Sequence, residues 1–113
     1  MNFNEYQSEA LKTAQYPNVG VNLVYPAMGL AGEAGEFCDK IKKFWRNTGF
    51  MSGGRLTSLE RNEVVKELGD VLWYIAAAAE ELGVAMETVA ELNLHKLHDR
   101  KARGVIKGAG DNR

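Results

Sequence analysis

The segment from Thr57 to Leu82 constrains the fold most, because its apolar residues recur at helical spacing throughout. They follow one another at intervals of 3, 4, 3, 4 and 3 residues: Val65, Leu68, Leu72, Ile75, Ala79 and Leu82. This spacing places them on one face of an α-helix as a heptad-like seam. Thr57 followed by Glu60 forms a capping box, and Gly83 suits the helix end. The segment therefore predicts a long helix with one buried face.

A second long helix is predicted from about Ala27 to Asn47. Its apolar positions recur at intervals of 4, 3, 4 and 3 residues: Leu30, Ala34, Phe37, Ile41 and Phe44. Two antiparallel helices with such stripes pack by turning them toward each other. We therefore expect the two seams to face each other in the core.

Two further helices are predicted, over residues 4–15 and 85–102. Asn4 is the expected N-cap of the first, which ends before Pro17 because the residue preceding a proline disfavours the helical region. Residues 16–26 are expected to connect it to the next helix, with extended character at 19–24. Residues 48–55 are expected to form a loop, since they contain three glycines.

The chain of 113 residues is thus expected to be one all-α domain, a four-helix bundle-like arrangement completed by homo-oligomerisation. The glycine-rich tail at about 104–113 is expected to be ordered only by contacts within the assembly. A net charge of −1 excludes a generally basic nucleic-acid binder. The single cysteine excludes an internal disulfide, and no segment reads as a membrane span or a signal peptide. These features favour a cytoplasmic protein.

Two carboxylate pairs lie beside the two seams. Glu33 and Glu36 belong to the first long helix, and Glu67 and Asp70 to the second. A separation of three residues places each pair on neighbouring turns, about 5–6 Å apart at Cβ. If the helices face each other, four negative charges converge and require a cation. All-oxygen ligands favour Mg²⁺, with Mn²⁺ as a substitute. The alternative reading is that these are solvated side chains on exposed faces.

Glycines interrupt both acidic segments. Gly32, Gly35 and Gly69 each cost about 1 kcal/mol relative to alanine inside a helix. Close approach of a neighbouring helix or of a ligand would explain them.

The sequence resembles the MazG-like family of all-α nucleoside triphosphate pyrophosphohydrolases. The resemblance rests on GLAGEAGEFCDKIKK (29–43), KELGDVLWYIA (66–76), NLHKLHDRKARG (93–104) and the closing GDNR. It implies that Glu33, Glu36, Glu67 and Asp70 bind Mg²⁺. It also implies a homodimer or homotetramer with active sites close to subunit interfaces.

The expected reaction splits a nucleoside triphosphate into monophosphate and pyrophosphate, as a nucleotide-pool house-cleaning step. Glu36 and Glu67 are the candidate catalytic carboxylates, with Glu36 preferred as general base. Lys43 continues the face of Glu33 and Glu36 and is a candidate phosphate ligand. The resemblance favours Asn93 and Lys96 on the phosphate side, with Arg103 as a further candidate and Arg100 a lesser one.

Aromatic residues are candidates for base recognition. Tyr74 lies one turn after Asp70, and Trp45 is a second candidate, whereas Trp73 is expected to pack. The resemblance also suggests that the first helix closes over the nucleotide, with Tyr6 or Gln7 contributing.

The remaining reactive side chains are given structural roles. His95 and His98 are read as surface or interface residues, and Cys38 as core filler rather than a nucleophile.

Three alternatives stay open. Phosphoribosyl-ATP pyrophosphohydrolase shares the chemistry, and a helical module could bind nucleotide or metal without turnover. A di-iron carboxylate protein would need Glu-x-x-His motifs, which the sequence lacks.

Overall fold

The computed structural model describes residues 1–48 and 55–113. Within these ranges it contains four α-helices and no strand: α1 (Phe3–Leu11), α2 (Val24–Thr48), α3 (Ser58–Glu81) and α4 (Met86–Ala102). The all-α prediction is therefore confirmed. The loop predicted at 48–55 falls, apart from its two ends, outside the described residues. None of the helices in the described ranges combines the length and hydropathy that a membrane span requires.

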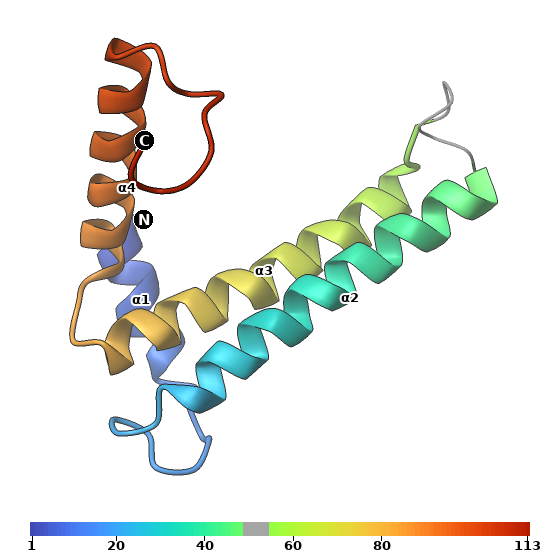
Figure 1. The fold of residues 1–113 in the computed structure, drawn as a ribbon. Coiled ribbons are helices and arrows are strands. Elements are labelled where there is room, and N and C mark those ends of the chain that lie inside the picture. Colours follow the sequence, from blue (N-terminus) through green and yellow to red (C-terminus); the bar gives the residue numbers. More distant parts are fainter. Residues whose placement is uncertain (49–54) are drawn as a thin grey trace.

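The helices form an open arrangement rather than a closed bundle. α2 and α3 run antiparallel as a long hairpin, α1 crosses the C-terminal half of α3, and α4 leaves α3 at a steep angle (Figure 1). The radius of gyration is 17.1 Å, whereas a compact domain of this length has about 13 Å. A single chain thus leaves much of its helical surface without a helical neighbour.

The capping signals are confirmed for α3 and shifted for α1. The Thr57 side chain accepts from the backbone N–H of Glu60, whose carboxylate accepts from that of Thr57. Gly83 follows the helix with a φ of 70°, which favours glycine. In α1 the N-cap is Asn2 rather than Asn4, because Glu5 completes a capping box with Asn2.

α1 ends at Leu11, earlier than predicted, because a distant side chain helps to satisfy its last turn. The carbonyl of Ala10 accepts from the Thr13 hydroxyl and from the indole N–H of Trp73, at 2.6 and 3.2 Å. Trp73 also donates to the Thr13 hydroxyl at 2.9 Å. These bonds fix the end of α1 against α3.

α2 begins at Val24, three residues before the predicted start. The Asn22 side chain accepts from the backbone N–H of Tyr25. Pro26 costs no hydrogen bond in the first turn, where a backbone N–H has no helical partner. The extended segment expected at 19–24 is accordingly not formed.

Glu81 holds the connector between α1 and α2. Its carboxylate accepts from the Tyr16 hydroxyl and from the backbone N–H groups of Gly20 and Asn22, at 2.8 and 3.1 Å for the last two. Burial and the bond to Glu81 raise the pKa of Tyr16 to about 12, and the same bond lowers that of Glu81. One carboxylate therefore shapes a connector that has no regular structure.

Gln7 ties α1 to the turn between α3 and α4. It is buried, and its amide nitrogen donates to the Glu80 carboxylate and the Val84 carbonyl, at 3.2 and 3.1 Å. Its amide oxygen accepts from the backbone N–H of Met86 at 2.8 Å. Since Met86 begins α4, this side chain helps to set the direction in which α4 leaves.

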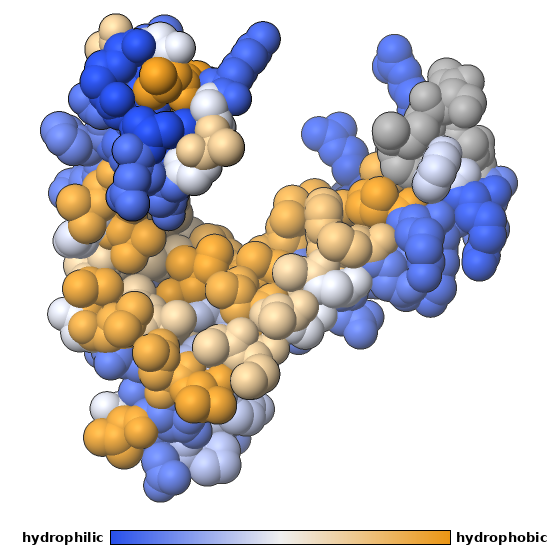
Figure 2. Space-filling view, in the orientation of Figure 1, coloured by the Kyte–Doolittle hydropathy of each residue, from blue (hydrophilic) through white to orange (hydrophobic). Residues whose placement is uncertain are grey.

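The face that α3 turns toward α2 differs from the predicted one. It carries Glu63, Glu67, Asp70 and Tyr74, spaced by 4, 3 and 4 residues, which contact α2 side chains or backbone. The predicted seam is only partly covered: Val65, Leu68 and Leu82 are 56%, 48% and 61% exposed, whereas Leu72 and Ile75 are half-buried and Ala79 is buried. The buried residues of α3 are Val64 and three alanines near its C-terminal end, Ala76, Ala77 and Ala79, of which only Ala79 belongs to the predicted seam. Figure 2 shows the resulting apolar surface over the inner angle of the molecule.

Gly29 of α2 leaves room for the aromatic ring of Tyr74, which comes from α3. A Cβ built at Gly29 would lie 2.1 Å from the Tyr74 ring. That ring cannot withdraw freely, because it lies 5.0 Å from Trp73 and 6.4 Å from Tyr25 between ring centroids. Tyr25 in turn stacks on Tyr16 at 4.8 Å. Gly29 therefore has a packing role, whereas a Cβ on Gly32, Gly35 or Gly69 would meet nothing within 4 Å.

The tail folds back on α4 within the single chain, contrary to expectation. The Arg113 guanidinium donates to the backbone carbonyls of Val105, Ile106 and Gly110. Asp111 binds α4 through Arg100, whose guanidinium donates to the Asp111 carboxylate and carbonyl at 3.1 and 2.8 Å. These contacts within the chain hold residues 104–113 against α4.

The packing role of Gly29 predicts a difference between two Gly→Ala variants. Gly29→Ala should lower the free energy of unfolding by about 1–3 kcal/mol, since the added methyl overpacks the Tyr74 ring. Gly32→Ala, one turn away in open space, should raise it by about 0.5–1 kcal/mol through helix propensity. Urea unfolding followed by circular dichroism measures both; equal effects would contradict the packing.

Candidate metal centre

Three of the four predicted metal ligands converge between α2 and α3. One carboxylate oxygen from each of Glu33, Glu67 and Asp70 lies within 4.8 Å of the other two. Glu33 comes from α2, and the other two come from neighbouring turns of α3. Because the helices are antiparallel, residues near 33 on one lie opposite residues near 70 on the other. The hairpin itself therefore assembles the cluster.

The cluster is electrostatically strained in the absence of a positive charge. Burial, and then the charges of Asp70, Glu67 and Glu36, raise the pKa of Glu33. Glu36 is exposed and lies outside the group of three, yet it is close enough to act on Glu33 through its charge. The fourth predicted ligand thus borders the cluster instead of completing it.

The donor set fits a hard divalent cation. It consists of carboxylate oxygens, and no histidine or cysteine of the described chain belongs to it. Mg²⁺ and Mn²⁺ prefer such ligands, and Mg²⁺ commonly uses only a few carboxylates together with water. The cluster also already holds a cationic group, because the Lys40 ammonium lies 2.6 Å from the Glu67 carboxylate.

An open pocket of about 350 Å³ adjoins the cluster. It is lined by Thr13, Glu33, Asp70, Trp73 and Tyr74. Burial, the charge and hydrogen bond of the neighbouring Tyr25, and the charges of Glu33 and Asp70 raise the pKa of Tyr74, whose protonated hydroxyl is hydrogen-bonded to Tyr25. Tyr74 therefore lies where the sequence analysis expected it. Thr13 was not foreseen, because nothing in the sequence relates the end of α1 to this pocket.

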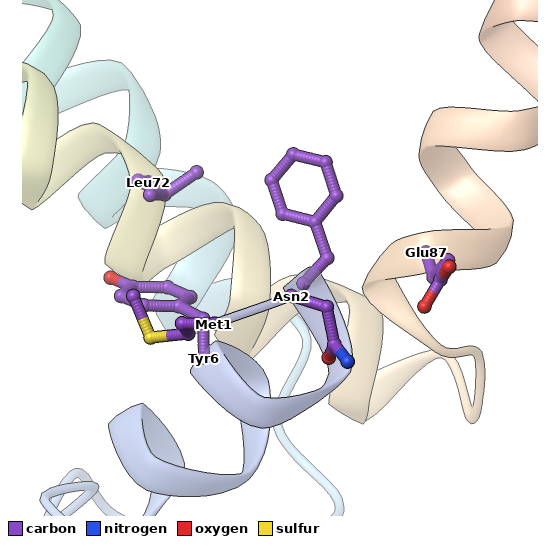
Figure 3. Close-up of a pocket in the computed structure, with 6 residues that line it drawn as sticks. Met1, Asn2, Tyr6, Leu72 and Glu87 are labelled. Atoms are coloured by element: carbon purple, nitrogen blue, oxygen red, sulfur yellow. The ribbon is translucent and has the colours of Figure 1, made fainter.

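The two α1 candidates differ in position. Tyr6 lines an apolar pocket of about 310 Å³ between α1, α3 and α4, together with Leu72 and Glu87 (Figure 3). Burial and the charge of Asp70 raise the pKa of Tyr6, which places its hydroxyl within the field of the cluster. Gln7 is committed to the turn before α4. Of these two residues, Tyr6 is the one whose hydroxyl is affected by the charge of the cluster.

The α2 candidates lie away from the acidic pocket. Lys43 forms an ion pair with Asp39 at 2.6 Å, and the Trp45 side chain is 51% exposed. Neither lines the pocket beside Glu33. Lys40 follows Glu33 and Glu36 by seven and four residues, which places it on the same face of α2, and its ammonium contacts Glu67 of the cluster.

The α4 candidates form a separate group. Asn93 and Lys96 line another pocket with Val89 and Leu92. Arg103 binds Asp99 at 2.9 Å, while the buried Arg100 holds the tail through Asp111. Within one chain these side chains do not border the acidic pocket.

The other reactive side chains are surface residues. Cys38 is exposed, so the expectation that it fills the core is wrong. His95 and His98 are exposed, in agreement with their reading as surface residues.

Comparison with known proteins identifies the domain. The profile of the family described as MazG nucleotide pyrophosphohydrolase domain matches residues 27–105. The chain is also similar to the "Gene 37 protein" of Mycobacterium phage L5, with 46% identity over 118 residues and full coverage of both chains. No solved structure matches the chain significantly.

The geometry of the cluster predicts how metal binding responds to losing one carboxylate. Glu33→Gln should weaken Mn²⁺ binding by at least about tenfold. Even the loss of a residue that only hydrogen-bonds to a metal ligand typically lowers metal affinity by about this factor. Titration calorimetry of chelator-treated protein measures this. Glu91→Gln, an exposed carboxylate on α4, is the control and should bind as the unmodified protein does. Equal affinities of the two variants would remove Glu33 from the site.

Proposed function

The chain belongs to the MazG nucleotide pyrophosphohydrolase domain family, and from this premise we propose that it hydrolyses (deoxy)nucleoside triphosphates to monophosphate and pyrophosphate with Mg²⁺. The observation that carries the proposal is the convergence of Glu33, Glu67 and Asp70 within 4.8 Å. We assign it to house-cleaning of the nucleotide pool in the cytoplasm.

The carboxylates are given separate roles in this proposal. Glu33, Glu67 and Asp70 would hold Mg²⁺, which when bound neutralises phosphate oxygens and lowers the pKa of coordinated water. Glu36 would act as general base, because its carboxylate is exposed and lies close enough to the cluster to act on Glu33 through its charge. It takes a proton from the water whose oxygen attacks the α-phosphorus. The α–β anhydride bond then breaks and pyrophosphate leaves.

Positioning of the substrate is proposed for the pocket residues. The neutral Tyr74 hydroxyl can donate to a phosphate oxygen or to the attacking water. Tyr74 and Trp73 meet edge to face at 5.0 Å and offer an aromatic wall for the base. We retain Trp45 and Lys43 as candidates for the outer part of the substrate.

A second copy of the chain would complete the site. The α4 candidates Asn93, Lys96 and Arg103 do not border the acidic pocket of their own chain. The seam containing Val65 and Leu68 is left about half exposed. Burying that seam against a second copy would stabilise a homodimer, or a homotetramer built from it. We propose that α4 cations then reach the triphosphate across the interface.

Two other functions use the same cluster. A phosphoribosyl-ATP pyrophosphohydrolase would release pyrophosphate from a different adenine nucleotide. A non-catalytic module would bind metal and nucleotide without turnover. A panel of triphosphates together with phosphoribosyl-ATP, assayed for pyrophosphate release with Mg²⁺, separates the three.

Turnover should depend on Glu67. Glu67→Gln is expected to lower kcat by about 100-fold or more, because a carboxylate at the reacting centre is lost. Circular dichroism should show an unchanged helical content. Product analysis should give monophosphate and pyrophosphate from the unmodified protein. Diphosphate and phosphate would contradict the mechanism, and full activity of the variant would contradict the site.

The seam predicts where the subunits meet. Val65→Glu should convert the oligomer to monomer in light scattering after size-exclusion chromatography, because it places a charge in an apolar interface. Leu59→Glu is the matched control: it lies on another face of α3 and is 79% exposed. An unchanged mass for Val65→Glu would exclude the seam as the interface.

A further inference from the structure

Lys40 is shared between two carboxylates of α3. Its ammonium lies 2.6 Å from Glu67 and 3.3 Å from Glu63. The Lys40 side chain is 29% exposed and that of Glu67 is 13% exposed, so the pair is partly shielded from water. The bond to Glu67, and then that to Glu63, raise the pKa of Lys40, which keeps it charged.

A divalent cation in the cluster would compete with Lys40 for the Glu67 carboxylate. Glu67 belongs to the cluster with Glu33 and Asp70, so a divalent cation there would draw on the carboxylate that Lys40 already holds. Two positive charges within hydrogen-bonding reach of one carboxylate repel each other. The binding of a divalent cation therefore weakens the pair between Lys40 and Glu67.

Glu63 gives Lys40 a second position. It lies one helical turn before Glu67 on the same face, and its other oxygen is bound by Lys66 at 3.1 Å. Glu63 is 47% exposed and lies outside the cluster of three. Lys40 can therefore remain paired with Glu63 when it leaves Glu67, at the cost of a small movement of its side chain.

We propose that Lys40 is a resident counter-cation that holds Glu67 in the metal-free protein and passes to Glu63 when the metal binds. Lys40 and Glu63 then set the metal affinity from outside the ligand set, as positioning residues. This inference rests on the proposed metal site, but it concerns the metal-free protein and needs no turnover to be tested.

The inference predicts opposite effects for the two residues. Lys40→Met should tighten Mn²⁺ binding by at least about fivefold, the low end of couplings between two ligands of one protein. It should also lower the Tm of the metal-free protein, because the carboxylates lose their counter-charge. Glu63→Gln should weaken Mn²⁺ binding, because Lys40 then stays on Glu67. Titration calorimetry and thermal unfolding of chelator-treated protein measure these effects.

Two controls separate the exchange from general electrostatics. Lys42→Met removes the same charge from the same helix, but Lys42 pairs with Asp39 at 3.2 Å, away from the cluster. This variant should change the Mn²⁺ affinity by less than about twofold, which is the size of the deviation commonly found between sites that do not interact. Lys40→Arg keeps the charge and should restore both the affinity and the Tm of the unmodified protein.

The double variant decides the route. If Glu63 acts through Lys40, Glu63→Gln should have no effect on Mn²⁺ binding in the Lys40→Met background. An equal loss of affinity in both backgrounds would overturn the exchange. Unchanged or weaker binding by Lys40→Met would also overturn it while leaving the metal site intact. Failure of the unmodified protein to bind Mn²⁺ would overturn the metal site as well.

Discussion

The mutual repulsion of carboxylates across the α2–α3 hairpin is the constraint on which the rest of the structure depends. Glu33, Glu67 and Asp70 approach within 4.8 Å at a partly buried position. Without a positive charge this arrangement opposes the packing of the two longest helices. Lys40 supplies one positive charge from within the chain. The acidic stripe of α3, formed by Glu63, Glu67 and Asp70, is thus part of the helix interface together with its counter-charges. Most helical hairpins bury apolar side chains in this place.

The sequence predicts the helices, because they follow from local spacing. The approach of the carboxylates was expected only on the condition that the two long helices face each other, and three of the four meet. Intervals of three and four residues define the long helices, and Thr57 with Glu60 defines the start of α3. The inward face of α3 could not be predicted. An apolar stripe through Val65 and Leu68 runs beside the acidic one, and periodicity alone does not say which of them meets α2.

The same limit explains the other differences. α1 ends where Trp73, far along the chain, donates to the carbonyl of Ala10. Gly29 is required by the ring of Tyr74, whereas the more conspicuous Gly32 faces open space. Each depends on a tertiary contact that no local pattern encodes. Open space beside Gly32, Gly35 and Gly69 leaves room for a ligand or a second subunit next to the carboxylates, and this accords with the proposed function.

The amide of Gln7 has a geometric consequence for the whole molecule. It is bonded to both ends of the turn that joins α3 to α4. α4 contains 17 residues, which at 1.5 Å per residue amount to about 26 Å. A tilt of roughly 10° at this turn would displace the far end of α4 by about 4–5 Å over that length. A small change at the contacts of Gln7 would therefore become a large displacement at the far end of α4. The position of the basic C-terminal end of α4 depends in this way on the turn at its N-terminal end.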